Sequence, residues 1–299
     1  MNETISPRPQ APLPEGPILD SILHPTDFSA GSLVAFHHAL KAAVVAKSNF
    51  TILHVATGAA REWKEFPGVR QTLERWGLIP PGSPKSALLE LGLDVHKVAA
   101  REESPVKSVL RYLETHPADF IVLATHQHEG RASWLRESVA EPIARGAGQA
   151  TLFIPEGTKG FVSAEDGSVT LPRILIPVAD TPRPQPALEA AARLAQRLQL
   201  ASGTFVLLHV GTAGAMPTVQ CPDVPGWEWK TVSRTGDVIQ GILETAAAEA
   251  AGLIVMTTDG RNGFLDALRG SHSERVLHAA ACPLLTIPVG SLAGGALTL

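Results

Sequence analysis

Short apolar runs alternate along the chain with stretches in which apolar residues recur at helical spacing. Residues 52–55 and 121–125 are two such runs, and Ser29 precedes a stretch of the second kind. The apolar face of that stretch consists of Leu33, Phe36, Leu40 and Val44. Ser104-Pro105 places a capping serine before a first-turn proline, which predicts a further helix start. Strands that alternate with helices predict β-α units around a parallel sheet.

The alternating pattern occurs twice. Residues 22–27 recur as 174–180, and residues 52–55 recur as 207–210. From Ile121, which matches Ile254, the offset stays at 133 residues up to Pro155, which matches Pro288. A register held over such a length indicates an internal repeat. We therefore expect two doubly wound α/β domains, each with five parallel strands and about four helices.

The repeat also predicts where the domains begin and end. The first domain is expected at 18–156 and the second at 172–290, with a polar linker at 157–171. The first copy is 22 residues longer between its second and fourth strands, and residues 61–82 predict an extra helical excursion or cap there. Tryptophans such as Trp76 are expected in the core. The alternative is that they line an apolar ligand pocket that this excursion covers.

Composition excludes several classes of protein. The chain has 44% hydrophobic and 18% charged residues, as soluble globular proteins do, and its net charge of −4 offers no basic field for a nucleic-acid backbone. Two cysteines exclude a disulfide scaffold and favour a reducing compartment. The polar, proline-rich N-terminus does not resemble a signal peptide, and no apolar run reaches the length of about 18 residues that spans a bilayer. These features predict a cytoplasmic protein that binds neither nucleic acid nor membrane.

Candidate binding residues gather at the predicted carboxyl ends of the strands, where open parallel sheets bind ligands. Asp27 and Asp180 follow the first strand of each copy, and the glycine-containing loop 260–271 follows the fourth strand of the second copy. Glycines allow backbone N–H groups to approach phosphate oxygens, and Ser271 is able to cap the next helix or donate its hydroxyl. The aspartates are able to accept hydrogen bonds from ribose hydroxyls. His54 and His209 are expected to form local hydrogen bonds at strand ends.

The ordered motifs I-L-x-P-x-D, L-H-V, D-x-I-V and G-x-x-G followed by G-S resemble the universal stress protein family in its tandem form. The resemblance covers both copies. It implies a five-stranded parallel sheet of order 3-2-1-4-5 in each copy and pairing of the copies about a pseudo-twofold axis. Many members of this family bind ATP or another adenine nucleotide, so the resemblance also implies such a ligand.

Carried over residue by residue, the resemblance implies a nucleotide site with two departures in the second copy. Only six residues separate Gly263 from Gly270, where the family pattern has nine, and Ala179 stands at the usual aspartate position. Asp180 would therefore have to contact the ribose from the next position. The implied site consists of Pro177, Val178 and Val232 near the adenine, Asp180 at the ribose, and Gly260, Gly263, Gly270 and Ser271 at the phosphates.

The first copy departs from the family pattern in its loop. It keeps Thr26, Asp27, Gly130 and Ser138, but Gln127 and Glu137 replace two loop glycines. The Glu137 carboxylate would repel phosphates, because two like charges about 4 Å apart cost about 1 kcal/mol even in water. The second copy is therefore the favoured site for an adenine nucleotide, with Mg²⁺ needed only for a triphosphate.

Three functional classes are compatible with the sequence. The preferred one is a non-enzymatic stress-response binding or interaction protein that senses a small ligand. The alternatives are an adenine-nucleotide-binding member with slow ATP hydrolysis, and a metal-binding member that uses His126 and His128 of the first copy. No catalytic residue is assigned. A tandem chain pairs its two copies internally, so a monomer and a homodimer of the chain are both compatible with it.

Overall fold

The computed structural model describes residues 19–56, 66–101, 104–125, 139–212, 214–258 and 272–289, and all structural statements below concern these residues. The chain divides into two compact units, and the division falls between Val169 and Thr170. Ile18–Val169 is called the first unit, and the residues from Thr170 onward the second unit. This division lies inside the segment 157–171 that the sequence predicts as a linker.

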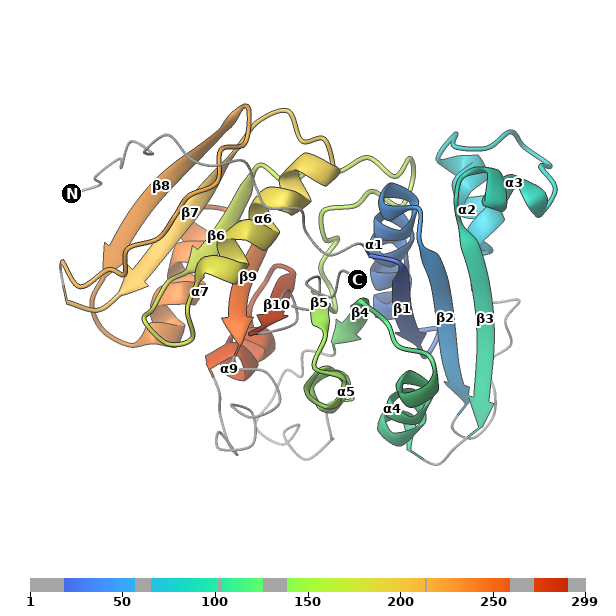
Figure 1. Cartoon of the computed structure of the whole chain (residues 1–299), viewed down its shortest axis with the longest axis horizontal. Coiled ribbons are helices and arrows are strands. Elements are labelled where there is room, and N and C mark those ends of the chain that lie inside the picture. The colour runs from blue at the N-terminus through green and yellow to red at the C-terminus, as the bar shows by residue number, and fades with distance from the viewer. Residues whose placement is uncertain are drawn as a thin grey trace, which may run out of the picture. The chain divides into compact units, whose positions relative to one another are not determined.

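The first unit contains a parallel five-stranded sheet of order β3-β2-β1-β4-β5 (Figure 1). The family resemblance implies this topology, and the structure confirms it. Its strands are β1 (Ser21–Thr26), β2 (Asn49–Ala56), β3 (Asp94–Arg101), β4 (Phe120–Thr125) and β5 (Ala150–Pro155).

The second unit repeats this topology as β8-β7-β6-β9-β10, again with every pair parallel. Its strands are β6 (Arg173–Pro177), β7 (Gly203–Val210), β8 (Trp227–Arg234), β9 (Leu253–Thr258) and β10 (Leu284–Pro288). In both units the strand order reverses between the first and fourth strands of the copy. Parallel strands that connect on opposite sides of such a point leave a crevice beyond their carboxyl ends.

Helices cover both faces of each sheet. Right-handed crossovers place the helix after the first strand on one face and the helices after the third and fourth strands on the other. Accordingly α4 contacts α5 in the first unit, and α7 contacts α9 in the second. The helices are α1 (Ala30–Ala46), α4 (Pro105–Thr115) and α5 (Ala140–Ala147), then α6 (Gln185–Arg197), α7 (Val238–Ala248) and α9 (His272–Ala279), with two short helices, α2 (Val69–Arg75) and α3 (Ser86–Glu90), inserted in the first unit.

Predicted helix starts are confirmed at two serines. The Ser29 hydroxyl accepts a hydrogen bond of 3.1 Å from the Ser32 N–H, and Ser104 likewise caps α4 through the Lys107 N–H, with Pro105 in the first turn. Each cap satisfies one backbone donor that the helix itself leaves unpaired. The Ser29 cap fixes the start of α1 directly after β1, at the carboxyl end of the sheet.

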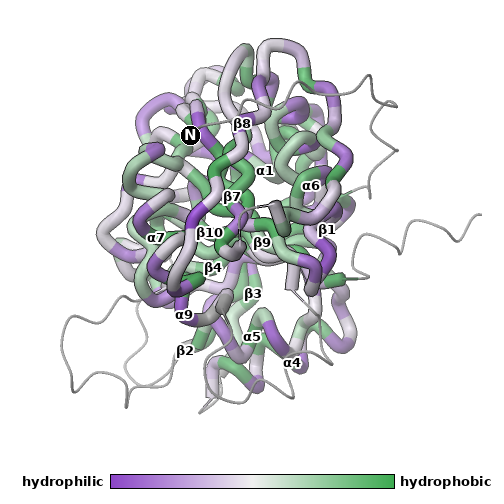
Figure 2. The backbone as a smooth tube through the Cα atoms, turned by 90° about the vertical axis from the view of Figure 1, so that its left-hand side faces the viewer, coloured by the Kyte–Doolittle hydropathy of each residue, from purple (hydrophilic) through white to green (hydrophobic). Residues whose placement is uncertain are grey.

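The strands carry the cores. Every residue of β5, β9 and β10 is buried, as expected for parallel strands covered on both faces. Figure 2 shows the same distribution, with hydrophobic colouring along the strands and hydrophilic colouring on the outer turns. Trp76, Trp227 and Trp229 are all buried, which confirms the core placement predicted for these tryptophans.

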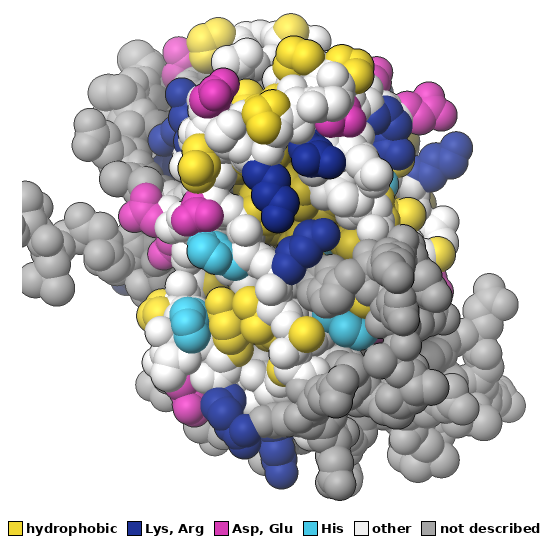
Figure 3. All heavy atoms as spheres, turned by 90° about the vertical axis from the view of Figure 1, so that its right-hand side faces the viewer, with side chains coloured by type: hydrophobic (Ala, Val, Ile, Leu, Met, Phe, Trp, Pro, Cys, Tyr) yellow, Lys and Arg dark blue, Asp and Glu magenta, His cyan; other side chains and the backbone are white. Residues whose placement is uncertain are grey.

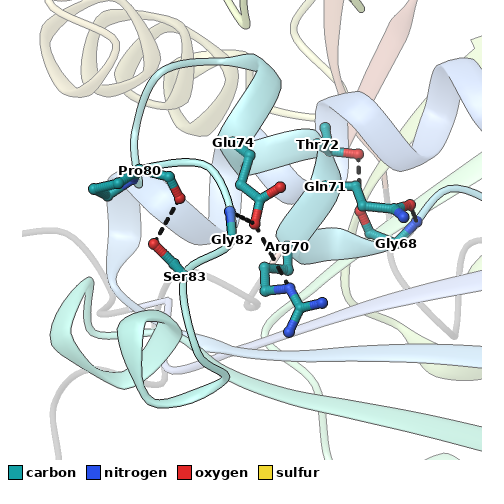
Figure 4. Close-up of polar contacts among 8 residues, drawn as sticks. All are labelled: Gly68, Arg70, Gln71, Thr72, Glu74, Pro80, Gly82 and Ser83. Carbon is teal, nitrogen blue, oxygen red and sulfur yellow. Dashed lines mark hydrogen bonds and ion pairs between the residues drawn. The ribbon is translucent and has the colours of Figure 1, made fainter.

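The inserted segment of the first unit is folded. Its described part contains α2, as the predicted helical excursion at 61–82 requires, and buries Phe66 and Trp76. The short helix α3 follows after the predicted end of the excursion. Local polar contacts hold its turns together (Figure 4): Glu74 accepts from the Gly82 N–H at 3.1 Å, and the Ser83 hydroxyl donates to the Pro80 carbonyl at 2.6 Å. The surface around α2, α3 and β3 intersperses basic, acidic and apolar side chains (Figure 3).

Residues 156–169, called the strap, pack on the first unit. The strap closes on itself through a bridge between Val162 and Val169. The His38 Nε2 accepts backbone hydrogen bonds from Phe161 at 3.0 Å and Val162 at 3.3 Å. The Trp76 indole donates to the Ala164 carbonyl at 3.3 Å. A segment with the composition of a linker is thus fixed to α1 and to the end of α2.

The outermost strands, β3 and β8, each pair with a single described strand, β2 and β7 respectively. On β3, Asp94, His96 and Lys97 are exposed, and Asp94 lies 3.2 Å from the His96 Nε2. On β8, Lys230 pairs with Glu249 of the turn after α7 at 2.7 Å. None of the helices in the described ranges is long and apolar enough to cross a bilayer.

Candidate functional site

The carboxyl end of β1 in the first unit is closed by its own hydrogen bonds. One oxygen of Asp27 accepts from the Ser29 N–H at 2.9 Å and from the Ser32 hydroxyl at 2.6 Å. The Thr26 hydroxyl accepts from the Phe28 N–H at 3.1 Å. Both predicted side chains of this end, Thr26 and Asp27, are therefore engaged in shaping the entry into α1.

An aromatic stack lies beside this closed end. Phe28, buried and in the left-handed region with φ 61°, stacks on the His54 ring with centroids 3.9 Å apart. Phe66 of the inserted segment lies 5.0 Å from Phe28. A non-glycine residue tolerates this backbone region only where packing compensates its steric cost. Three rings thus pack where the first unit would otherwise offer a ligand surface.

Burial also sets the charge of a nearby histidine. Complete burial lowers the pKa of His24 to about 4, while its hydrogen bond to the Val122 carbonyl and the Asp27 charge act in the opposite direction. His24 is therefore neutral at pH 7. It lies against Phe36 and Phe66, at centroid distances of 6.3 and 6.4 Å.

The second unit has a different carboxyl edge. Val178 is buried, and its N–H donates to the Leu208 carbonyl at 2.8 Å, which extends the ladder between β6 and β7. Asp180 follows on the surface, exposed to solvent. Asp180 and Thr181 stand in the chain where the first unit has Phe28 and Ser29, so the ring that packs on His54 has no aromatic counterpart here.

The two strand-end histidines act alike. The His54 ring donates through Nδ1 to the Thr26 carbonyl at 2.9 Å, and the His209 ring donates through Nδ1 to the Val178 carbonyl at 3.2 Å. The donor role follows because a carbonyl only accepts. The predicted local hydrogen bonds of both histidines are confirmed. Each bond links the ends of two neighbouring strands at the carboxyl edge.

The structure separates two residues that the sequence assigns to one adenine contact. Val232 of β8 pairs in register with Leu208 of β7, and Val178 bonds to Leu208 from the other side. Two strand spacings of about 4.8 Å therefore lie between the backbones of Val178 and Val232. A single ring that touches both residues would have to lie across the end of β7.

Several predicted site residues lie outside the described residues, namely Gly130, Ser138, Gly260, Gly263, Gly270 and Ser271, together with His126 and His128 of the metal hypothesis. Among the described residues, no group of three or more histidine, cysteine, aspartate or glutamate side chains is arranged to hold a metal ion.

A cavity that the sequence reasoning missed opens at the ends of β7 and β8. Its volume is about 510 Å³, and its wall includes Gly211, Arg234, Asp237 and Glu244. The only sequence signal is the run Ser233-Arg234-Thr235-Gly236-Asp237 before α7, which reads as an ordinary strand-to-helix turn.

Comparisons with known proteins agree with this architecture. A sequence model of the Universal stress protein family matches residues 19–155 and 223–288. A universal stress protein from Archaeoglobus fulgidus DSM 4304 is 17% identical, with 89% of this chain and 95% of that chain covered and a TM-score of 0.59. A functionally unknown protein from Pseudomonas aeruginosa PAO1 is 15% identical, with coverages of 92% and 95% and a TM-score of 0.56. At these identities the likeness establishes the fold.

A universal stress protein in complex with cAMP is 17% identical and aligns with 46% of this chain and 98% of its own, at a TM-score of 0.32. No curated protein matches the sequence.

Proposed function

Because the chain belongs to the universal stress protein family, we propose that it is a non-enzymatic stress-response protein that binds a small ligand at the carboxyl edge of its second unit. The observation that carries this proposal is the difference between the two carboxyl edges. The first unit fills its edge with its own side chains, whereas the second leaves a carboxylate exposed beside the point where the strand order reverses.

The closed first edge supports a structural role for that unit. A ligand there would have to displace Phe28 from His54 and break the hydrogen bonds of Asp27 to Ser29 and Ser32. Aromatic contacts of this kind contribute about 0.5–1.5 kcal/mol beyond burial, and hydrogen bonds to a charged group about 1.5–3 kcal/mol. Binding energy spent on breaking them is lost from affinity.

An adenine nucleotide is the candidate ligand that the second unit favours. Asp180 is exposed after β6, and its carboxylate would accept hydrogen bonds from ribose hydroxyls. The sequence of residues 260–271 contains glycines and Ser271 that would contact phosphates. Val178 offers little surface to an adenine because it is 3% exposed. The described residues therefore fit the ribose better than the base. Mg²⁺ would accompany a triphosphate only.

The first test is to purify the full chain without added ligand, denature it and identify the released small molecules by mass spectrometry. We expect close to one bound molecule per chain. Asp180→Asn should lower that occupancy, because an amide accepts more weakly than a carboxylate. The control variant Asp27→Asn alters the aspartate that follows β1 at the closed edge and should leave the occupancy unchanged.

The outcomes separate the two levels of the proposal. An adenine nucleotide that is lost in Gly263→Glu, whose new carboxylate would repel phosphates, supports the nucleotide candidate. A different small molecule that depends on Asp180 supports ligand binding without the nucleotide. An empty protein, or a ligand that depends on Asp27 and not on Asp180, contradicts the proposal.

A further inference from the structure

The cavity of the second unit lies on its two outer strands, away from the reversal point between β6 and β9. Its volume is about 510 Å³, within the range of small-molecule sites. The wall is formed by the residue after β7, the last two residues of β8, the turn that follows β8 and the first two turns of α7, namely Gly211, Ser233, Arg234, Thr235, Gly236, Asp237, Gln240, Gly241 and Glu244. These elements differ from those that carry Asp180. Ligand binding at this cavity and ligand binding at the proposed edge site are therefore tested by separate variants.

Glycines account for the free space. Gly236 has φ 112°, a region that disfavours other residues, and a side chain added there would meet nothing within 4 Å. A Cβ added to Gly241 would lie 2.9 Å from the Val210 side chain, so the helix approaches β7 closely at that point. The loop thus bends over an unfilled volume while α7 stays packed on the sheet.

A pre-oriented carboxylate stands in the wall. One oxygen of Glu244 accepts from the Arg234 guanidinium at 3.0 Å, and the other accepts from the Gln240 amide at 2.7 Å. These bonds link three polar side chains of the wall to one another. The planar guanidinium carries five N–H donors, of which one is used here, and each carboxylate oxygen has a second lone pair. The wall therefore offers both hydrogen-bond donors and acceptors.

The charges and side chains of the wall select the chemistry of a ligand. Asp237 and Glu244 outnumber Arg234, so the wall disfavours an anion such as a phosphate. None of the wall residues has a large apolar side chain, so a hydrocarbon ligand would gain little by burial. A neutral ligand with many hydroxyl groups satisfies both conditions, because each hydroxyl donates one hydrogen bond and accepts others.

We propose that this cavity binds an uncharged polyhydroxylated ring, a free sugar or the sugar of a glycoside, through Arg234, Gln240 and Glu244. Glu244 accepts from adjacent hydroxyl groups of the ring, and Arg234 donates to a hydroxyl or ring oxygen. The Ser233 and Thr235 hydroxyls border the same opening.

Calorimetric titration of the full chain tests the proposal with two probes, methyl β-D-ribofuranoside and methyl β-D-glucopyranoside. We expect at least one to bind with a dissociation constant below about 1 mM. Glu244→Gln should weaken that binding about tenfold, because hydrogen bonds to a charged group are stronger than neutral ones. The matched control is Glu249→Gln, which removes the other ion pair that joins β8 to the α7 region, between Lys230 and Glu249, outside the cavity.

Binding that falls in Glu244→Gln and stays within about twofold in Glu249→Gln supports the cavity as a sugar site. Equal loss in both variants would indicate a general effect on α7 and overturn the proposal, as would no binding by either probe. Binding of the 2,3-dideoxy riboside as tightly as of the riboside would also overturn it. Asp180→Asn should leave the titration unchanged, which separates this result from the edge site.

Discussion

Three buried histidines of the first unit stay neutral at pH 7. Burial is the largest cause that lowers the pKa of each of His24, His37 and His38 to about 4. For His37, the Arg75 charge and His24 lower it further. For His38, the hydrogen bond to the Val34 carbonyl acts in the opposite direction. The neutral state leaves the Nε2 of His38 free to accept from the strap.

These pKa values predict an acid-sensitive fold. A histidine with a folded pKa near 4 and an unfolded pKa of 6.5 binds protons more readily when unfolded. Its contribution is complete above about pH 6.5 and is lost as the pH falls toward 4, at about 1.4 kcal/mol per pH unit for each histidine. Urea unfolding between pH 7 and pH 4.5 should show this decline in the free energy of unfolding.

The variant His24→Ile tests how much of the pH dependence of the free energy of unfolding comes from His24. The equivalent position of the second copy is Ile176. The same fold therefore already holds isoleucine at this position of the first strand. We expect a shallower dependence on pH, by close to one proton per chain. An unchanged slope would show that His24 is not the titrating group.

Residue-level sequence reasoning succeeded where the signal is local. The caps at Ser29 and Ser104 and the strand-end bonds of His54 and His209 depend on neighbours in the chain or on the repeat. Two contacts were not predicted, namely the hydrogen bond between Asp27 and Ser32 and the stacking of Phe28 on His54. The sequence around Asp27 is compatible both with an open strand end and with one that is filled by side chains. What distinguishes them is Phe66, which reaches this end from the inserted segment.

Among the elements, the strap depends most on a single side chain. His38→Ala would remove the acceptor of the Phe161 and Val162 N–H groups, and each unsatisfied buried donor costs about 1–3 kcal/mol. Hydrogen exchange of these two amides should accelerate strongly. Trp76→Phe, which removes only the bond to the Ala164 carbonyl, should affect exchange less. Unchanged protection in His38→Ala would show that the strap is held by other contacts.

The start of β8 depends on Gly226 for two reasons. Gly226 has φ 78°, and an added Cβ would collide with the backbone carbonyl oxygen of Ala201. Gly214 has φ 86° and open space around it. Gly214→Ala should therefore lower the free energy of unfolding only by the cost of the left-handed backbone conformation, about 1–2 kcal/mol. Gly226→Ala should be less stable than Gly214→Ala by about a further 1–3 kcal/mol. Thermal unfolding of the two variants measures this difference, and equal melting temperatures would contradict it.

At the scale of the whole molecule, each unit has its own buried strands and helices, and the division at Val169 and Thr170 leaves no element shared. Units with separate cores unfold separately when their stabilities differ enough. In Gly226→Ala we therefore expect urea unfolding to become biphasic. Hydrogen exchange monitored by mass spectrometry should show β6–β10 opening first while β1–β5 stay protected. A single transition for all peptides would contradict this expectation.

The alternation of strands and helices could be predicted from the sequence, because the pattern occurs twice. The strand order 3-2-1-4-5 is implied by the resemblance of the ordered motifs to the universal stress protein family, and residues 61–82 predict the helical excursion that contains α2. The cavity beside α7 could not be predicted, because it depends on the backbone conformation of the turn after β8, including φ 112° at Gly236, which composition does not report. The packing of residues 156–169 depends on His38, which is more than a hundred residues away in the chain.

The outer strand β3 has a consequence for the protein in concentrated solution. An exposed strand edge invites a strand of another molecule to extend the sheet, and ionised side chains that would have to be desolvated oppose this. Asp94 and Lys97 are exposed on β3, and Lys230 and Arg234 of β8 are held in ion pairs with Glu249 and Glu244. We therefore expect the concentrated protein to resist fibril formation at pH 7, as measured by light scattering and thioflavin fluorescence, and Asp94→Val with Lys97→Val to shorten the lag before fibrils form.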